Sequence, residues 1–241
     1  MEKMENQSVI DEAIAYGKKA YQTLVANSHH RDRSWEHCHK ACLYCRETCR
    51  QESREPNDKE VDELCLHLAV YLASWGMYRN SFLMGNDYKI HADVVRILLD
   101  SNRDDLWEIS ADKMAEETKA ESIMDLYGAI RDTYREIAGT TPTDTLLTKV
   151  LLATVCCTPA FDTNFKKAMS LTGITKQKCC KESLMALGKF YKKHMESQFE
   201  DFFEDKDIDE KYPAARMIDM CFFEYGQALY NAEKEGKTAK S

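Results

Sequence analysis

The most apolar stretch of the chain is LCLHLAVYLASWGMY at residues 64–78, in which only His67 and Ser74 are clearly polar. Its apolar residues follow helical spacing on one face and occupy other faces as well, so little of the helix circumference is left for water. The stretch is shorter than the roughly 20 residues that cross a bilayer, and charged residues bracket it. We therefore predict a central buried helix that other helices surround.

Amphipathic helical patterns recur along the rest of the chain, and no segment shows sustained alternation of polar and apolar residues. Helices are expected at about 8–27, 34–54, 58–78, 88–99, 122–137, 144–157, 160–171, 183–203 and 213–232. The sequence predicts an all-α fold, a compact bundle or orthogonal array of about eight to ten helices with no sheet. We expect a single domain over 1–241, with two lobes at about 1–110 and 111–235 as an open alternative and a frayed tail at 236–241.

The formal net charge is -8 at pH 7, and the composition includes 10 cysteines. A net acidic chain is atypical of proteins that wrap nucleic acid through many phosphate contacts, although a local basic groove stays compatible with it. The N-terminal residues MEKMENQSVIDEAIAYG contain no apolar signal core. We therefore expect a cytoplasmic protein without a membrane span, whose cysteines are reduced. No cofactor is indicated; the partner, an unknown small molecule or nucleic acid, and the oligomeric state stay open.

Four cysteines recur at helical spacing, namely Cys38, Cys42, Cys45 and Cys49. The first three spell C-x3-C-x2-C and are similar to the cluster motif of radical S-adenosylmethionine enzymes, a family that places this motif in a loop of a βα barrel. Here the pattern is helical, and one face of one helix does not by itself enclose a cluster or a tetrahedral metal ion. We favour a stripe of thiols packed in the core, with a metal site on these four cysteines as the less favoured alternative.

Aromatic and polar side chains gather around the end of the central helix: Trp75, Tyr78, Arg79, Tyr88, Lys89 and His91. Rings beside guanidinium, ammonium and imidazole groups can hold a planar or anionic ligand by stacking and charge-assisted hydrogen bonds. The alternative is an arginine that caps helix carbonyls, with the aromatic residues in the core. Both interpretations stay open.

A second apolar helix, LLTKVLLATVCC, leads through Thr158 and Pro159 to Asp162. This order places one carboxylate at a helix start, close to the core. Asp162 is a candidate cap for the next helix. Beside Phe161 and Phe165, the carboxylate is also a candidate for a desolvated base or for a group that stabilises a cation.

The segments RSWEHCHK, LAVYLASWGMYRNSFL, PTDTLLTKVLLATVCCTPAFD and YPAARMIDMCFFEYG resemble an uncharacterised bacterial protein family over nearly the whole chain. A second, remote resemblance covers residues 139–169, where TKVLLATVCCTPAFDTNF is similar in layout to the helix-hairpin-helix DNA glycosylases. In that family an apolar helix and a proline-containing turn precede an aspartate, which stabilises cationic character at the sugar as the base departs. The resemblance implies a catalytic role for Asp162. Leu147 occupies roughly the place of the lysine nucleophile of bifunctional members, and Lys149 is offset from it.

The leading functional hypothesis is a pocket domain that handles a nucleobase or nucleic acid and is related to base-excision glycosylases, with or without retained activity. Its candidate catalytic residue is Asp162, and its candidate pocket residues are Trp75, Tyr78, Arg79, Lys149, Lys89 and His91. The alternative is a non-enzymatic helical interaction protein, and a thiol or metal-binding protein is a third hypothesis. The first hypothesis requires that the two apolar helices lie side by side and leave a hollow into which one acid and one cation project.

Overall fold

The computed structural model describes residues 6–174, 176–205 and 211–238. Within these ranges the chain forms eleven α-helices and three short 3-10 helices with no strand, which confirms the predicted all-α class. The helices are α1 (Gln7–Ala26), α2 (Arg33–Gln51), α3 (Asp58–Ser74), η1 (Phe82–Gly85), η2 (Tyr88–His91), α4 (Ala92–Leu98), η3 (Ser101–Leu106), α5 (Ala111–Met114), α6 (Glu117–Ala138), α7 (Asp144–Ala153), α8 (Thr163–Met169), α9 (Lys181–His194), α10 (Glu196–Asp205) and α11 (Ala214–Thr238).

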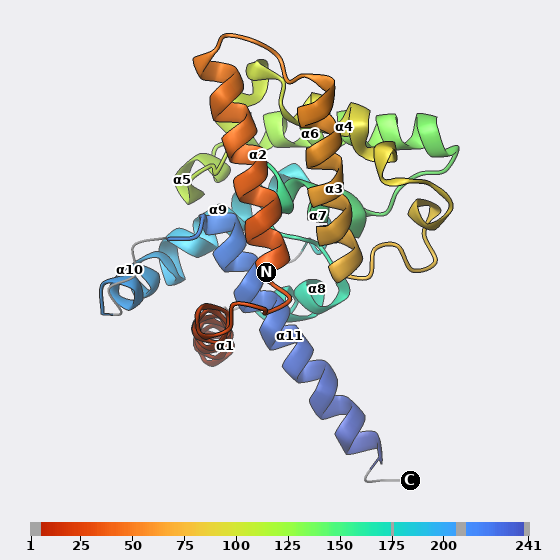
Figure 1. Cartoon of the computed structure of the whole chain (residues 1–241). Coiled ribbons are helices and arrows are strands. Elements are labelled where there is room, and N and C mark those ends of the chain that lie inside the picture. The colour runs from red at the N-terminus through yellow and green to blue at the C-terminus, as the bar shows by residue number, and fades with distance from the viewer. Residues whose placement is uncertain (1–5, 175, 206–210, 239–241) are drawn as a thin grey trace.

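The predicted central helix is α3, which lies beside α2 (Figure 1). Asn57 caps it, not Asp58, because the Asn57 side chain accepts from the backbone of Glu60 while Glu60 reaches back to the Asn57 amide. The helix ends at Ser74, and Gly76 follows in the left-handed conformation with φ 71°. Leu66 is 45% exposed and Val70 is 62% exposed. The prediction that other helices surround this segment on all sides was therefore wrong for one face.

The second apolar helix, α7, is the one that is enclosed. Every residue from 146 to 153 is buried, and the helix contacts α2, α3 and α6. Side chains of α2 bind two carbonyl groups near its C-terminal end: the Trp35 indole donates to the Leu152 oxygen at 2.9 Å, and His39 Nδ1 lies 2.7 Å from the Thr154 oxygen. These bonds satisfy carbonyls that would otherwise be buried without a partner.

The long helix α11 packs along α1 and α8, and its C-terminal half extends beyond the other helices (Figure 1). Two glycines, Gly17 on α1 and Gly226 on α11 itself, allow α1 and α8 to approach α11 closely. A Cβ atom on Gly17 would lie 2.2 Å from Cys221 Sγ, and one on Gly226 would lie 2.0 Å from the backbone oxygen of Asn164. Since Asn164 belongs to α8, glycine at 226 sets how closely α11 approaches that short helix.

Several expected boundaries differ from the structure. The helix predicted to end at 157 ends at Ala153, the one predicted from 160 begins at Thr163, and the one predicted from 122 begins at Glu117. The segment predicted as one helix over 183–203 is divided at Met195 into α9 and α10. Helix α11 continues to Thr238, past the predicted start of a frayed tail at 236, while residues 239–241 lie outside the described residues. The acidic segment EDKDIDEK, expected to be a solvated turn, lies mostly outside them as well.

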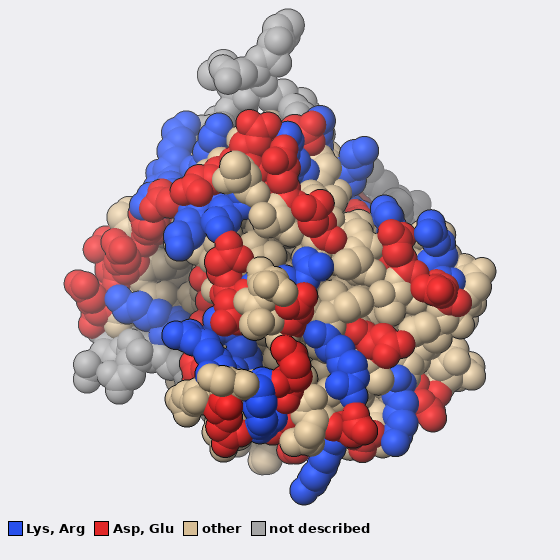
Figure 2. Space-filling view, turned by 90° about the horizontal axis from the view of Figure 1, so that it is seen from above, with Lys and Arg blue, Asp and Glu red and all other residues tan. Residues whose placement is uncertain are grey.

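Charges of both signs are interleaved over the face seen in Figure 2, where acidic and basic side chains alternate over short distances. Among the described residues, no helix has the length and apolar character required to cross a membrane.

Candidate functional site

The turn between α7 and α8 is held by side chains from two helices. On α7, the Thr148 hydroxyl accepts from the Phe161 amide at 2.9 Å, and the Thr145 hydroxyl donates to the Phe161 oxygen at 3.0 Å. On α11, the Asp219 carboxylate accepts from the Ala160 amide at 3.0 Å. These three bonds fix the backbone immediately before Asp162, so the direction of its carboxylate is set by packed helices and not by a free loop.

The two oxygens of Asp162 have different partners. Oδ1 accepts from the Phe165 amide at 2.9 Å, which makes Asp162 the N-cap of α8. Oδ2 lies 3.1 Å from the ammonium of Lys149, whose side chain is 5% exposed, while that of Asp162 is 13% exposed. Water screens such a pair weakly, so its charges act strongly on any group brought beside it.

Trp75 follows α3 and places its indole ring next to this ion pair. Lys149 Nζ lies 4.5 Å from the ring centroid, and Arg31 Cζ, from the turn between α1 and α2, lies 4.2 Å from it. Phe223 of α11 packs edge to face on the same ring at 5.2 Å. Among the described residues, the buried indole nitrogen of Trp75 has no hydrogen-bond partner. A buried donor of this kind costs about 1–3 kcal/mol until an acceptor reaches it.

These groups line a pocket of about 300 Å³, at the lower end of the size range of small-ligand sites. Segments far apart in the sequence meet there. Its walls are Arg31, Trp75, Met77, Thr145, Lys149, Asp162, Thr163, Asn164 and Phe223.

A buried network of charges lies behind the pocket. Arg216 of α11 bonds Asp219 at 2.9 Å and Asp32 at 3.2 Å. Burial raises the pKa of Asp219 to about 6, against the opposing effects of Arg216 and Lys149. Burial lowers the pKa of Arg216, but the carboxylates of Asp32 and Asp219 raise it by more, so the guanidinium stays charged. The Asp219 carboxylate that holds the turn is therefore itself fixed by a permanent cation.

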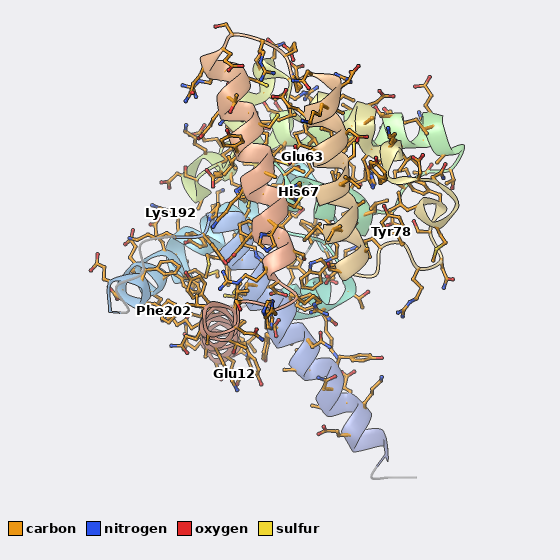
Figure 3. All side chains as sticks on the ribbon, in the orientation of Figure 1. Glu12, Glu63, His67, Tyr78, Lys192 and Phe202 are labelled. Carbon is orange, nitrogen blue, oxygen red and sulfur yellow. The ribbon has the colours of Figure 1, made fainter. Side chains whose placement is uncertain are left out.

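The structure brings together three of the residues singled out in the sequence, Trp75, Lys149 and Asp162. It does not bring the others to this pocket. The hydroxyl of Tyr78 (Figure 3) lies 3.3 Å from His91 Nε2, and His91 Nδ1 lies 2.6 Å from the buried Tyr134 hydroxyl.

Two further candidates also lie elsewhere. Lys89 pairs with Asp62 at 3.1 Å, outside the pocket. Arg79 is exposed and does not line the pocket.

Six of the nine pocket residues were not singled out in the sequence: Arg31, Met77, Thr145, Thr163, Asn164 and Phe223. Phe223 directly follows the buried Phe222 on α11, so it lies off the buried apolar face of that helix. Arg31 lies in a polar turn, where no periodic pattern indicates its direction.

A larger groove of about 670 Å³ adjoins the pocket and shares Arg31 with it. It runs between α2 and α3, where Glu63 and His67 lie one turn apart (Figure 3). Its other walls are Ser28, His29, His30, Arg33, Ser34, His37, Leu66 and Val70.

The four cysteines of α2 are buried, and all ten cysteines of the chain are free thiols. This burial agrees with the predicted stripe of packed thiols. The hydrogen bond between Cys38 and Cys42, and then desolvation by burial, raise the pKa of the Cys38 thiol well above its usual value.

Comparison of the chain with protein-family models, with curated proteins and with solved structures finds no match.

Proposed function

We propose that the protein binds a nucleobase-bearing ligand in the pocket at Asp162 and Lys149 and acts as a glycosylase-like enzyme. The observation that carries this proposal is the buried ion pair of Lys149 and Asp162, 3.1 Å apart, in the wall of a pocket that Trp75 also lines. The indole ring of Trp75 offers a stacking surface for a base once the Arg31 guanidinium, 4.2 Å from the ring centroid, turns toward the groove that it also lines.

Asp162 would stabilise the reaction's developing charge. When the bond between the sugar and the base breaks, the base leaves with the bonding electrons and the sugar acquires positive charge. A carboxylate that is already ionised and fixed by an N-cap bond needs little reorganisation to stabilise that charge. Water then adds to the sugar carbon, and the proton that it loses neutralises the departed base anion. Lys149 keeps the carboxylate oriented and offers a hydrogen-bond donor to the departing base.

The groove beside the pocket supports a ligand that carries phosphate. Arg31 is common to the pocket and the groove, and His29, His30, Arg33, His37 and His67 line the groove. The two arginines are local cations in a chain of net charge -8, and the imidazoles can hydrogen-bond phosphate oxygens. A nucleotide or a nucleic-acid end fits this arrangement better than an extended duplex does, because the chain carries a net charge of -8. A cytoplasmic location, where thiols stay reduced, completes the proposal.

The alternative function, a non-enzymatic interaction protein, has one observation in its favour. Leu66 and Val70 are exposed in the same groove, and exposed apolar side chains in a concave surface suit a protein partner. In this alternative Asp162 is a cap and nothing more.

Asp162→Asn separates the two functions, because asparagine caps a helix about as well as aspartate but carries no charge. We expect release of modified bases from oligonucleotides to fall by about 100-fold or more. The matched control is Asp144→Asn, which removes a part-buried carboxylate near the start of α7 that bonds Tyr127 at 3.0 Å outside the pocket. That variant should keep the wild-type rate.

The Asp162→Asn variant leaves Lys149 buried without its partner, at a cost of about 3 kcal/mol. The double variant Asp162→Asn with Lys149→Met removes both charges, so it should regain stability and stay inactive. Equal rates of base release by the wild type and Asp162→Asn would contradict the proposal. So would a wild type that releases no modified base from any of the oligonucleotides.

A further inference from the structure

Three side chains from α2 and α3 bring possible metal ligands together at the N-terminal end of α3, the opposite end from Trp75 of the pocket. The Sγ atoms of Cys45 and Cys49 and a carboxylate oxygen of Glu60 all lie within 4.8 Å of one another. The two cysteines are one helical turn apart on α2, and Glu60 is in the first turn of α3. Glu60 is held in place there because its carboxylate accepts from the Asn57 amide at 2.9 Å.

We propose that Cys45, Cys49 and Glu60 form a binding site for a thiophilic divalent cation of the zinc class. Zinc binds thiolate sulfur at about 2.3 Å and carboxylate oxygen at about 2.0–2.2 Å, so neighbouring ligand atoms in a tetrahedron are about 3.5–3.8 Å apart. The three atoms need to approach one another by about 1 Å at most to reach that geometry. Binding displaces the two thiol protons to solvent, and the thiolates and the carboxylate bind the metal.

The fourth position of the tetrahedron is reachable from outside. A groove of about 360 Å³ is lined by Cys49 together with Arg50, Arg54 and Asp104. A site with three protein ligands and one accessible position leaves room for water or for an external ligand. Cys38 and Cys42, further along the same stripe, join no group of three possible ligands within 4.8 Å among the described residues.

Arg54 already holds a positive charge at this place. Its guanidinium donates to both oxygens of Glu60 at 2.7 Å, and its Nη1 lies 3.4 Å from Cys49 Sγ. Its Nε also bonds Glu52 at 2.5 Å, and the side chain is 32% exposed. A metal ion would therefore replace one cation by another, while Arg54 turns toward solvent and keeps Glu52 as its partner. The site is a cation site in which arginine and metal compete.

Because Arg54 competes with the metal ion, removing Arg54 should strengthen metal binding and not weaken it. The full-length reduced protein is titrated with Cd²⁺ under anaerobic conditions, and the ultraviolet absorption of the cadmium–thiolate bond is followed. We expect one equivalent to bind. Cys49→Ser should weaken binding by more than about 100-fold, since loss of an outer partner of a ligand alone costs 10- to 100-fold. Arg54→Gln should strengthen it, because the competing cation is gone.

The control variant is Cys180→Ser, which removes a partly exposed thiol from another part of the chain and should bind Cd²⁺ like the wild type. Alkylation of the wild-type protein supplies a second measurement that depends on no variant: Cd²⁺ should protect Cys45 and Cys49 from modification. Binding that survives Cys49→Ser, weakening by Arg54→Gln, or protection of other cysteines instead would overturn the proposal.

Discussion

At the scale of single residues, Asp162 shows what a sequence pattern can and cannot predict. Its position after a proline-containing turn and before an amphipathic helix predicts a cap, and the Oδ1 bond to Phe165 is that cap. The partner of the other oxygen, Lys149, lies in a helix in which every residue from 146 to 153 is buried. Helical periodicity places Lys149 on α7 but does not indicate which element faces it. Contacts between distant segments need the tertiary structure.

His91 gives a prediction about pH at the same scale. The ring is fully buried between the hydroxyls of Tyr78 and Tyr134, and burial lowers its pKa from the usual 6.5 to about 4. Between these pH values the unfolded chain takes up a proton that the folded protein does not. Stability is therefore lost as the pH falls from 6.5 toward 4, by up to about 3 kcal/mol from this residue.

Urea unfolding at pH 7 and pH 4.5 measures this effect. The wild type should lose more stability between the two pH values than His91→Gln does, whatever the stability of the variant at pH 7. The exposed His29 provides the control, because His29→Gln should show the wild-type pH dependence. An equal loss in wild type and His91→Gln would show that His91 does not account for the acid sensitivity.

At the scale of elements, periodicity predicted where helices lie better than where they end. The division of the 183–203 segment at Met195 is invisible in the pattern, because Met195, Phe199 and Phe202 are all buried and continue the apolar spacing across it. The C-terminal end of α3 depends on Gly76, whose left-handed conformation stops the helix inside an apolar run. The exposure of one face of α3 also could not be predicted, since Leu66 and Val70 on that face are as apolar as their buried neighbours.

The contact of α11 with α8 leads to a prediction at this scale. Gly226→Ala would place a methyl group 2.0 Å from the Asn164 backbone oxygen, so the two helices must separate. We expect the free energy of unfolding to fall by about 1–3 kcal/mol, because overpacking outweighs the better helix propensity of alanine. Because Asn164 and Phe223 line the pocket, ligand binding should weaken as well.

The matched control is Gly128→Ala in the middle of α6, where a Cβ atom would meet nothing within 4 Å. That change should stabilise the protein by up to about 1 kcal/mol. Thermal unfolding of the two variants measures both effects. A stabilised Gly226→Ala variant would mean that α8 and α11 are not held at the distance described.

At the scale of the whole molecule, the pocket lies where four separate helices meet. Trp75 follows α3, Lys149 belongs to α7, Asp162 precedes α8 and Phe223 belongs to α11. The all-α class was expected from periodicity, and the leading functional hypothesis required α3 and α7 to lie side by side, as their contact shows. The depth of the pocket and the presence of Arg31 were not, because they depend on how a turn outside both apolar helices folds back over Trp75.

The most direct test of the pocket is a calorimetric titration with nucleoside 5′-monophosphates. The account predicts one saturable site in the wild type. Lys149→Met should weaken binding by at least about tenfold, equivalent to about 1.4 kcal/mol, while Lys166→Met, which removes the lysine 3.5 Å from Asp144 outside the pocket, should bind like the wild type. No saturable heat with any of the nucleotides, or unchanged binding in Lys149→Met, would contradict it.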